Sequence, residues 1–183
     1  MRIISGRFRG RPLVSFKASH IRPTTDRVKE SIFNKLNVYW DESRVLDLYS
    51  GTGNLTLEAL SWGANHVTSV ESHDKSIEII RKNLSQFKVT SQVTLRKYDV
   101  LKFLKEYSGP PFDVILVDPP FTKKLADQSM DAVSVSGVFH RDTVIVIESS
   151  GTEVIKDEYQ PFVLWDRKNF GDKVVSFFHI GQP

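Results

Sequence analysis

Residues 45–71 read VLDLYSGTGNLTLEALSWGANHVTSVE, and this stretch indicates the fold class because two apolar runs flank one helical pattern. Residues 45–49 and 67–70 are short and aliphatic, as buried strands are. Residues 55–62 have apolar side chains at helical spacing and end before Gly63, a residue type common just past helix ends. A strand, a helix and a strand in this order predict two parallel strands joined by a crossover helix.

The same alternation continues along the chain. Further helices are expected over residues 75–87, 100–107 and 125–133, and further strands over residues 93–97, 112–117 and 144–147. The last two strands differ, because only a short connection with Asn169 and Gly171 separates residues 162–168 from 174–180. They must pair as a hairpin, so one of them runs antiparallel to the rest. The pattern predicts a Rossmann-like α/β fold with a mostly parallel sheet and helices on both faces.

The composition narrows the class of protein. The chain has 183 residues and no cysteine, so it can form neither a disulfide nor a thiolate metal site, and its five histidines lack metal-ligand spacing. The length fits one domain, which we divide into a basic amino-terminal hairpin and helix (residues 1–40) and a catalytic core (residues 44–183). No run reaches the length of a membrane span and no secretory signal pattern is present. We expect a cytoplasmic monomer without a metal or a membrane partner.

The positive charge is concentrated at the amino terminus. Residues 1–30 hold eight Lys or Arg against two acidic residues, whereas the whole chain has a net charge of only +3. Such an arm either binds a polyanion through its phosphates or is a solvated basic hairpin, and charge alone favours neither. The candidate phosphate ligands are Arg7, Arg9, Arg11, Arg22 and Arg27.

The loop after the first core strand is a candidate nucleotide site, because ligands of open α/β sheets collect at the carboxyl ends of strands. Gly51 and Gly53 allow a tight turn, and Glu71, 20 residues past Gly51, ends the next strand, where a carboxylate can bridge ribose hydroxyls. A dinucleotide site has the same spacing. However, Thr56 replaces the third glycine of the dinucleotide motif, and Asp47 would repel a pyrophosphate. A carboxylate here would instead attract the ammonium and sulfonium of S-adenosylmethionine, and Asp99, after the third strand, could accept a hydrogen bond from its adenine amine.

Residues 118–121 read DPPF and follow a buried strand. An exocyclic amine of a nucleobase is a poor nucleophile, and two acceptors must hold its N–H groups while its lone pair faces the methyl group. Asp118 and the Pro119 carbonyl can supply these acceptors, the rigid Pro119-Pro120 pair preorganises them, and Phe121 can stack on the base. Such a base must leave its helix or lie in an unpaired loop. The alternative is a strand terminator with an incidental acid.

Four stretches together resemble one known family: RIISGRFRGR (2–11), RPTTDRVKESIFN (22–34), DLYSGTG with LEAL (47–53 and 57–60), and DPPF (118–121). The chain is similar to RsmD-type methyltransferases, bacterial enzymes that use S-adenosylmethionine to methylate guanine N2 in 16S ribosomal RNA. Residues 170–178 also resemble the last hairpin of the family. The chain departs from the family pattern at Trp62, where a basic residue is common, and at residues 138–142, where a Pro-Gly-Gly turn is usual.

The resemblance implies a seven-stranded sheet with an antiparallel last strand and a small amino-terminal β-hairpin that helps to hold RNA. The implied substrate is the guanine numbered 966 in 16S rRNA, within a small-subunit assembly particle. Asp118, Pro119, Pro120 and Phe121 are implied to hold the base. The implied donor ligands, among which the Thr24-Thr25 helix start would meet the donor carboxylate, are Thr24, Thr25, Asp47, Ser50, Gly51, Gly53, Glu71, Ser72, Asp99 and Val100.

Other functions remain open at this point. An amino methyltransferase could act on adenine or cytosine of another RNA or of DNA, although no residues remain for a separate DNA-recognition domain. A protein-glutamine methyltransferase more usually has Asn in place of Asp118. The chain could also be a catalytically silent rRNA-binding assembly factor, but its intact acids argue against such decay.

Overall fold

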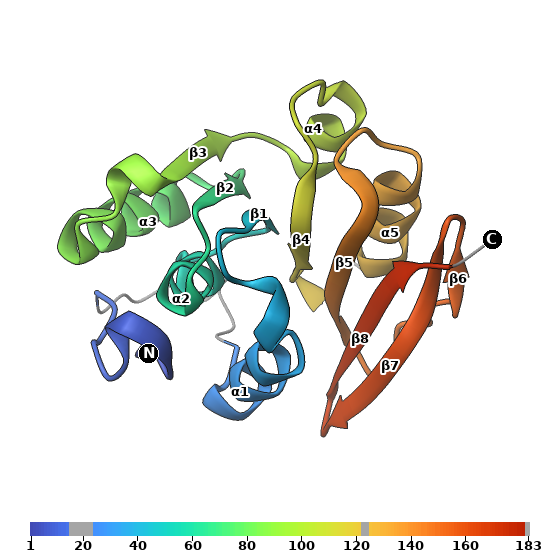
Figure 1. Cartoon of the computed structure of the whole chain (residues 1–183), viewed down its shortest axis with the longest axis horizontal. Helices are drawn as coiled ribbons and strands as arrows, with labels where there is room; N and C mark the ends of the chain where they lie inside the picture. Colours follow the sequence, from blue (N-terminus) through green and yellow to red (C-terminus); the bar gives the residue numbers. More distant parts are fainter. Residues whose placement is uncertain (15–23, 122–124, 182–183) are drawn as a thin grey trace.

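A computed structural model of the chain describes residues 1–14, 24–121 and 125–181. Its centre is one eight-stranded sheet with the order β3-β2-β1-β4-β5-β8-β7-β6 (Figure 1). Neighbouring strands from β3 through β5 are parallel, and β8 pairs antiparallel with both β5 and β7. The strands are β1 (Arg44–Leu48), β2 (His66–Glu71), β3 (Val93–Lys97), β4 (Phe112–Val117), β5 (Phe139–Ser150), β6 (Glu158–Tyr159), β7 (Phe162–Phe170) and β8 (Lys173–Ile180).

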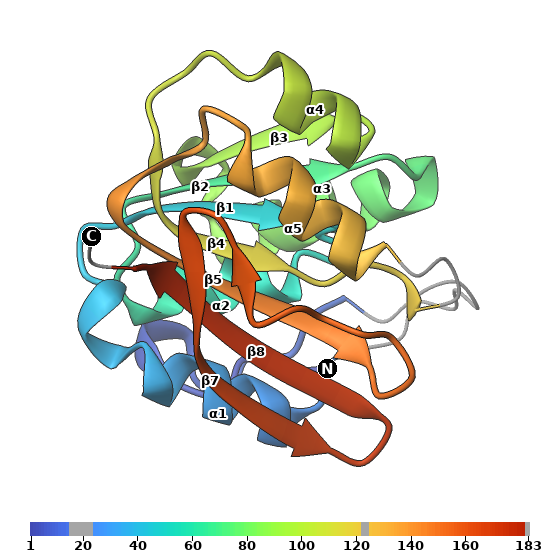
Figure 2. The same ribbon diagram turned by 90° about the vertical axis from the view of Figure 1, so that its right-hand side faces the viewer.

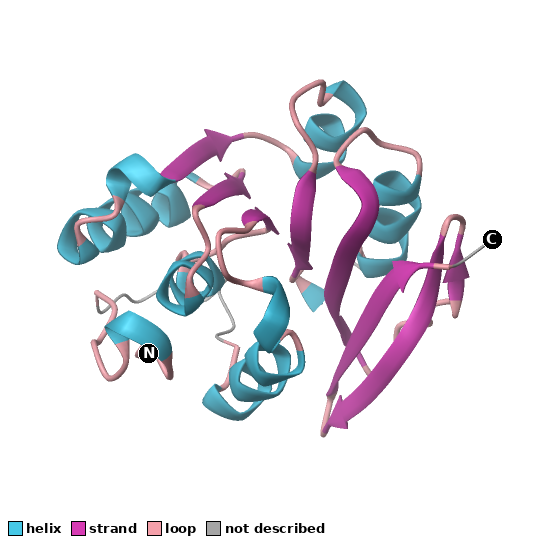
Figure 3. Cartoon of the chain, viewed as in Figure 1, coloured by secondary structure: helices cyan, strands magenta, loops and turns pink. Residues whose placement is uncertain are grey.

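Helices cover both faces of the sheet (Figures 1 and 3). The α-helices are α1 (Asp26–Lys35), α2 (Asn54–Trp62), α3 (Asp74–Phe87), α4 (Val100–Glu106) and α5 (Ala126–Ser134), and the 3-10 turns are η1 (Gly6–Phe8), η2 (Asn37–Tyr39) and η3 (Thr90–Gln92). Side chains of α1, α2 and α3 share one buried core, which includes Ile32, Leu57 and Ile80. Side chains of α4 and α5 share the other, which includes Leu104 and Met130. The predicted three-layer α/β fold is therefore confirmed.

Side-chain alternation along β1 explains where its polar residue lies. Val45 belongs to the core under α1–α3, whereas Leu46 and Leu48 belong to the core under α4 and α5. Asp47 has the parity of Val45 and so faces the α2 side of the sheet, where it is buried. A buried carboxylate in the middle of a parallel strand is costly unless it has partners or a function.

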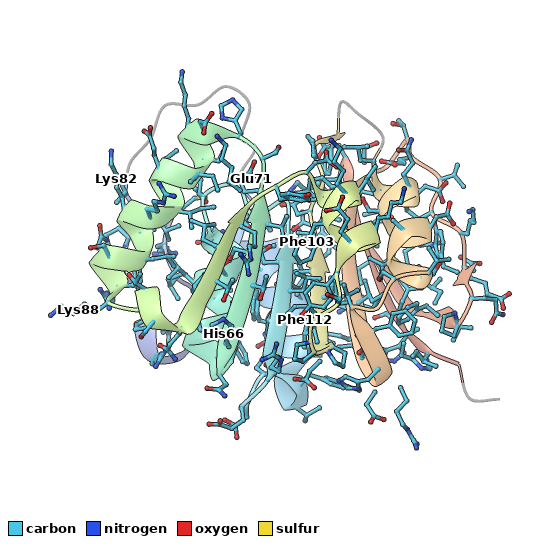
Figure 4. All side chains as sticks on the ribbon, turned by 90° about the horizontal axis from the view of Figure 1, so that it is seen from above. His66, Glu71, Lys82, Lys88, Phe103 and Phe112 are labelled. Atoms are coloured by element: carbon cyan, nitrogen blue, oxygen red, sulfur yellow. The ribbon has the colours of Figure 1, made fainter. Side chains whose placement is uncertain are left out.

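The carboxyl ends of the central strands meet at one edge of the sheet. The arrows of β1, β4 and β5 point to the same side in Figure 2. Glu71 and His66 lie at opposite ends of β2 in Figure 4, with Glu71 at the carboxyl end. Because β1 pairs with both β2 and β4, this edge brings together the residues that follow these three strands.

Two details of the predicted fold are wrong. The sheet has eight strands and not seven, because Glu158–Tyr159 pairs with Val163 and Phe162 at the edge, and two residues are too few to produce a recognisable pattern. The amino-terminal arm is not a regular β-hairpin. It is a loop around η1 with a single bridge between Arg2 and Pro12, in which the Ile3 N–H donates to the Arg11 oxygen at 3.0 Å.

The arm folds as a loop because it packs closely on α2. The N–H of Phe8 donates to the Ser61 hydroxyl at 2.9 Å, and a Cβ on Gly6, whose φ is +72°, would lie 1.9 Å from the Ser61 backbone oxygen. Beneath the arm, the buried ammonium of Lys29 in α1 donates to the Arg2 backbone oxygen at 2.6 Å and forms an ion pair with Glu58 of α2 at 2.8 Å. These contacts fix the arm to the body of the protein. Among the described residues, no helix is long and apolar enough to cross a membrane.

Candidate active site

The loop after β1 has the tight geometry expected for a nucleotide site. Tyr49, Gly51 and Gly53 have φ values of 64°, 56° and 76°, a region that L side chains rarely adopt. The Ser50 hydroxyl donates to the Asp47 backbone oxygen at 2.8 Å, and the Gly53 N–H donates to the Ser50 oxygen at 2.7 Å. The loop thus turns the chain back on itself directly before α2.

Asp47 lies beneath this loop with one carboxylate oxygen satisfied and one not. The Thr56 hydroxyl donates to Asp47 Oδ2 at 2.5 Å, and Thr56 is the residue that stands where a dinucleotide motif has glycine. Asp47 Oδ1 is buried and has no partner among the described residues. Burial raises the pKa of Asp47 to about 7, against the lowering effect of the hydrogen bond from Thr56. A nearby cation would stabilise the ionised form, so this environment fits a donor with positive charge.

Glu71 joins the ends of β1 and β2. Its Oε2 accepts a hydrogen bond from the Gly51 N–H at 2.9 Å, and its Oε1 accepts one from the His73 N–H at 2.8 Å. Ser72 beside it is exposed. Glu71 is partly exposed at the carboxyl edge, where a ribose could exchange with these amide partners.

Asp99, a candidate adenine ligand, also has a structural role. It is the N-cap of α4, and its Oδ1 accepts from the Lys102 N–H at 3.0 Å, whereas Val100 is buried in the core below. Asp99 is exposed and follows the carboxyl end of β3, where Lys97 pairs in register with Glu71. The expectation that Asp99 meets an adenine amine stays a prediction.

DPPF lies beside the loop that follows β1, here called the donor loop (residues 49–53), because β1 and β4 are neighbouring strands. The Asp118 N–H donates to the Leu48 oxygen at 3.4 Å, which extends the pairing of β4 with β1 by one residue. Asp118 is partly buried, Pro119 is buried and Pro120 is exposed. Phe121 is partly buried, and the Lys173 ammonium lies 5.2 Å from the centre of its ring. An acid, a carbonyl and an aromatic ring are therefore presented together at the carboxyl edge.

The two threonines before α1 have different partners. Thr25 is the N-cap of the helix and accepts from the Val28 N–H at 3.4 Å. The Thr24 hydroxyl lies 3.1 Å from Asp118 Oδ2 and 3.1 Å from Glu148 Oε1. Thr24 therefore contacts the DPPF end of the site directly, which the sequence did not indicate.

Glu148 and Lys173 are site residues that the sequence pattern did not reveal. Both are almost fully buried, and Lys173 Nζ lies 2.7 Å from Glu148 Oε2. A signal for Glu148 existed, because it directly follows the buried strand run 144–147, as Asp118 follows β4. No comparable signal marked Lys173. Burial and the neighbouring Glu148 charge together raise the pKa of Asp118 well above its usual range, while Lys173 and the Thr24 hydroxyl act in the opposite direction.

The candidate RNA ligands lie in two separate places. In the arm, Arg7 donates to Gln92 Oε1 at 2.8 Å and Arg11 donates to the Gln86 oxygen at 2.9 Å, so both are tied to the body near the end of α3. Arg9 is exposed. Arg27 lies on α1, and Arg22 lies outside the described residues.

Arg27 lines an open groove of about 520 Å³ between α1 and the end of β7. Lys168 Nζ donates to the Ser31 hydroxyl at 3.3 Å across the groove, and the Arg27 guanidinium lies 5.8 Å from the centre of the Phe170 ring. The remaining lining residues are polar: Glu30, Asn34 and Asn169. Phe170 pairs in register with Lys173, so the groove begins next to DPPF.

Within residues 1–14, 24–121 and 125–181, no group of three or more acidic or histidine side chains could hold a metal ion. The fold, the glycine loop with its unpartnered carboxylate oxygen, and DPPF on the neighbouring strand define a class I methyltransferase, whose methyl donor is S-adenosylmethionine. The family model described as "Conserved hypothetical protein 95" matches residues 1–179. The chain belongs to this family, the RsmD-type methyltransferases, which confirms the resemblance seen in its motifs.

Individual relatives agree with this assignment. The chain is 38% identical over 151 residues to "Ribosomal RNA small subunit methyltransferase D" of Haemophilus influenzae, covering 81% of this chain and 78% of that protein. It is 32% identical over 182 residues to the candidate rRNA methyltransferase YlbH of Bacillus subtilis, covering 97% and 98%. A solved structure of the candidate methyltransferase yhhF from Escherichia coli superposes with a TM-score of 0.84 at 29% identity, covering 98% and 97%.

Proposed function

We propose that this protein transfers a methyl group from S-adenosylmethionine to the exocyclic N2 of a guanine in 16S rRNA, at the position numbered 966. The observation that carries this proposal is the placement of DPPF at the carboxyl end of β4, beside the loop that follows β1. Two reactants must be held within a few ångströms of each other for a direct transfer, and neighbouring strand ends provide this proximity. The names of the relatives from H. influenzae and B. subtilis support rRNA as the substrate class.

The donor is expected to lie along the carboxyl ends of β1, β2 and β3. When bound, S-adenosylmethionine supplies a methyl group made electrophilic by its sulfonium. We assign Asp47, Ser50, Gly51 and Gly53 to its methionine side, since Asp47 Oδ1 lacks a partner and the loop is tight. Further along this edge, Glu71 and Ser72 would meet the ribose, and Asp99 and Val100 would meet the adenine.

The base is expected to lie between Asp118 and Phe121. Asp118 and the Pro119 carbonyl would accept the two hydrogens of the guanine amine, so that its lone pair faces the methyl group. Neither proline has an N–H that could compete for these acceptors. The amine nitrogen becomes cationic as the new N–C bond forms, and the Asp118 carboxylate would stabilise this charge and take up the proton.

The RNA around the base would be held by phosphate contacts. Arg9 of the arm is exposed and Arg27 lines the groove, so both can reach phosphates, and Arg7, Arg11 and Arg22 would add to the arm's positive field. We expect the substrate to be 16S rRNA in a partly assembled small subunit, where the target loop is still accessible.

The decisive experiment compares rRNA from a strain lacking this gene with rRNA from the same strain complemented by it. Digestion of the rRNA and mass spectrometry should show N2-methylguanosine missing at position 966 and restored by complementation. The purified protein should also transfer labelled methyl to unmodified 16S rRNA or its particles. Loss of a methylated adenine or cytosine instead would assign a different base, and an unchanged modification pattern would leave only an RNA-binding role.

A further inference from the structure

We propose that Glu148 and Lys173 are positioning residues for methyl transfer, which together with Thr24 orient Asp118 and set its charge state. The proposal rests on the proposed function, since it concerns how DPPF receives the amine. Its basis is a chain of buried polar contacts that runs from the carboxyl-terminal hairpin into DPPF. In this chain Lys173 contacts Glu148, Glu148 contacts Thr24, and Thr24 contacts Asp118.

The number of hydrogens in this chain constrains its protonation. Thr24 Oγ1 lies 3.1 Å from a carboxylate oxygen of Asp118 and 3.1 Å from one of Glu148, yet a hydroxyl has only one hydrogen to donate. If both acids were ionised, one of these contacts would join two acceptors. A single proton shared by the two acids removes this conflict, because the protonated carboxyl group donates to the hydroxyl and the hydroxyl donates to the other acid.

Lys173 decides which acid holds that proton. Its ammonium lies 2.7 Å from Glu148 Oε2, and both side chains are almost completely buried, so this pairing favours the proton on Asp118. Asp118 is then the acid that titrates. In agreement, burial and the Glu148 charge raise the pKa of Asp118, and the Asp47 carboxylate across on β1 acts in the same direction. Lys173 and Thr24 are the described groups that lower it.

The same lysine also contacts the aromatic end of DPPF. Lys173 Nζ lies 5.2 Å from the centre of the Phe121 ring, within the range of a cation–π interaction. One buried ammonium from β8 is therefore shared by Glu148, which acts on Asp118, and by the ring that is proposed to stack on the base. The antiparallel hairpin therefore supplies the Lys173 ammonium, which contacts Phe121 directly and acts on Asp118 through Glu148.

The test uses two substitutions that should act in opposite directions. Glu148→Gln removes a negative charge that raises the pKa of Asp118. In the pH profile of the single-turnover methylation rate, the rise on the acid side, called the acid limb, should therefore move to lower pH. Lys173→Met removes the positive charge, so this limb should move to higher pH. Shifts on the order of one pH unit are expected for charges at this range. A merely structural pair would lose activity in both variants without opposite shifts of the limb.

Two controls keep the result interpretable. Asp131→Asn and Lys156→Met remove the same charges from an exposed ion pair of 3.0 Å and should leave the pH profile unchanged. Thr24→Val removes the linking hydroxyl at constant volume, and it should reduce the rate at saturating RNA, whereas Thr24→Ser should retain most of it. Thermal unfolding of each variant shows whether the fold is kept.

A measurement without RNA separates this inference from the proposed function. The carboxyl carbon of Asp118, assigned with the Asp118→Asn variant, is titrated by NMR in free wild-type protein and in both variants. We expect its midpoint to fall in Glu148→Gln and to rise in Lys173→Met. If the midpoint moves in neither variant, the inference is overturned even when wild-type protein methylates 16S rRNA. If the midpoints move as expected but no RNA is methylated, the proposed function is wrong and the coupling of the acids stands.

Discussion

Asp118 is the residue on which the proposed chemistry depends most directly. Its carboxylate meets the amine chiefly as the nitrogen becomes tetrahedral and positive, so it contributes more to the transition state than to binding. Asp118→Ala should therefore reduce single-turnover methyl transfer by on the order of 10² to 10³ and barely change donor affinity. Asn at this position should retain part of the activity because its amide oxygen still accepts a hydrogen bond. A rate near that of the wild type in Asp118→Ala would show that DPPF is only a strand terminator.

Asp47 gives a prediction about stability. Its pKa in the folded protein is about 7 and the ordinary value is 3.8, so the folded state binds more protons than the unfolded state between these values. The contribution of Asp47 therefore destabilises the fold increasingly as pH rises from about 4 to about 7, by about 1.4 kcal/mol for each unit, and is constant above that. Asp47→Asn keeps an acceptor for the Thr56 hydroxyl and removes the charge.

The free energy of unfolding of Asp47→Asn, measured by urea denaturation, should accordingly exceed that of the wild type by more at pH 8 than at pH 5. Asp131→Asn, at an exposed carboxylate, serves as the control and should show no such trend. A difference between Asp47→Asn and wild type that is the same at both pH values would contradict the buried, protonated state of Asp47. The same variant should weaken binding of S-adenosylmethionine, because the proposed partner of its positive charge is lost.

At the scale of elements, α1 and the end of β7 form a groove whose walls both begin at the active site. Thr24, next to the N-cap of α1, contacts Asp118, and Phe170 at the end of β7 pairs with Lys173. Two cations, two amides, a hydroxyl, one aromatic ring and one acid line this groove. Its cations and its ring are the side chains that suit an unpaired nucleic-acid strand. In the arm, fewer cations are available to phosphates than the charge count suggested, because Arg7 and Arg11 already donate hydrogen bonds to Gln92 and to the Gln86 oxygen.

These contacts predict which cations matter for RNA binding. Arg9→Ala, Arg27→Ala and Lys168→Ala should each weaken RNA binding and lower the slope of log affinity against log salt by roughly 1, without changing donor affinity. Arg141→Ala is the matched control, since Arg141 is exposed near the start of β5, away from the carboxyl edge. Filter binding at several salt concentrations measures the slopes. If all three variants had the same slope as the wild type, the arm would be a solvated basic surface that does not bind phosphates. The groove would then also be excluded as a phosphate site.

At the scale of the whole molecule, the sheet order places the donor loop and DPPF on neighbouring strands, and this arrangement predicts the cofactor preference. We expect S-adenosylmethionine to bind with micromolar-range affinity and NAD to show no measurable binding, because Asp47 lies under the loop and Thr56, its partner, replaces the third glycine. Isothermal titration calorimetry with both ligands checks this. Tight binding of NAD would contradict the assignment of the loop to a methyl donor.

The order of the helices and of seven of the eight strands, the parallel core, the terminal hairpin and the position of DPPF at the end of β4 were predictable from the sequence. These features are local, because burial on one or both faces imposes a period on consecutive residues, and Gly63 marks the end of α2 where a left-handed residue is needed. The division into an arm with its helix and a core, the cytoplasmic location and the monomeric state stay predictions.

Contacts between polar residues far apart in the chain were not predictable from the sequence and depend on the three-dimensional arrangement of the elements. Thr24 and Glu148 are 124 residues apart in the chain and Glu148 and Lys173 are 25 apart, yet they form one series of contacts that ends at Asp118. No periodic pattern links such positions. The arm's true shape likewise depends on Ser61 of α2, 53 residues from Phe8. Hydrophobic periodicity reports which side of an element is buried, whereas the pairing of buried charges depends on which elements the sheet order makes neighbours. The position of DPPF at a strand end was therefore predictable from the sequence, whereas the polar contacts that surround Asp118 were not.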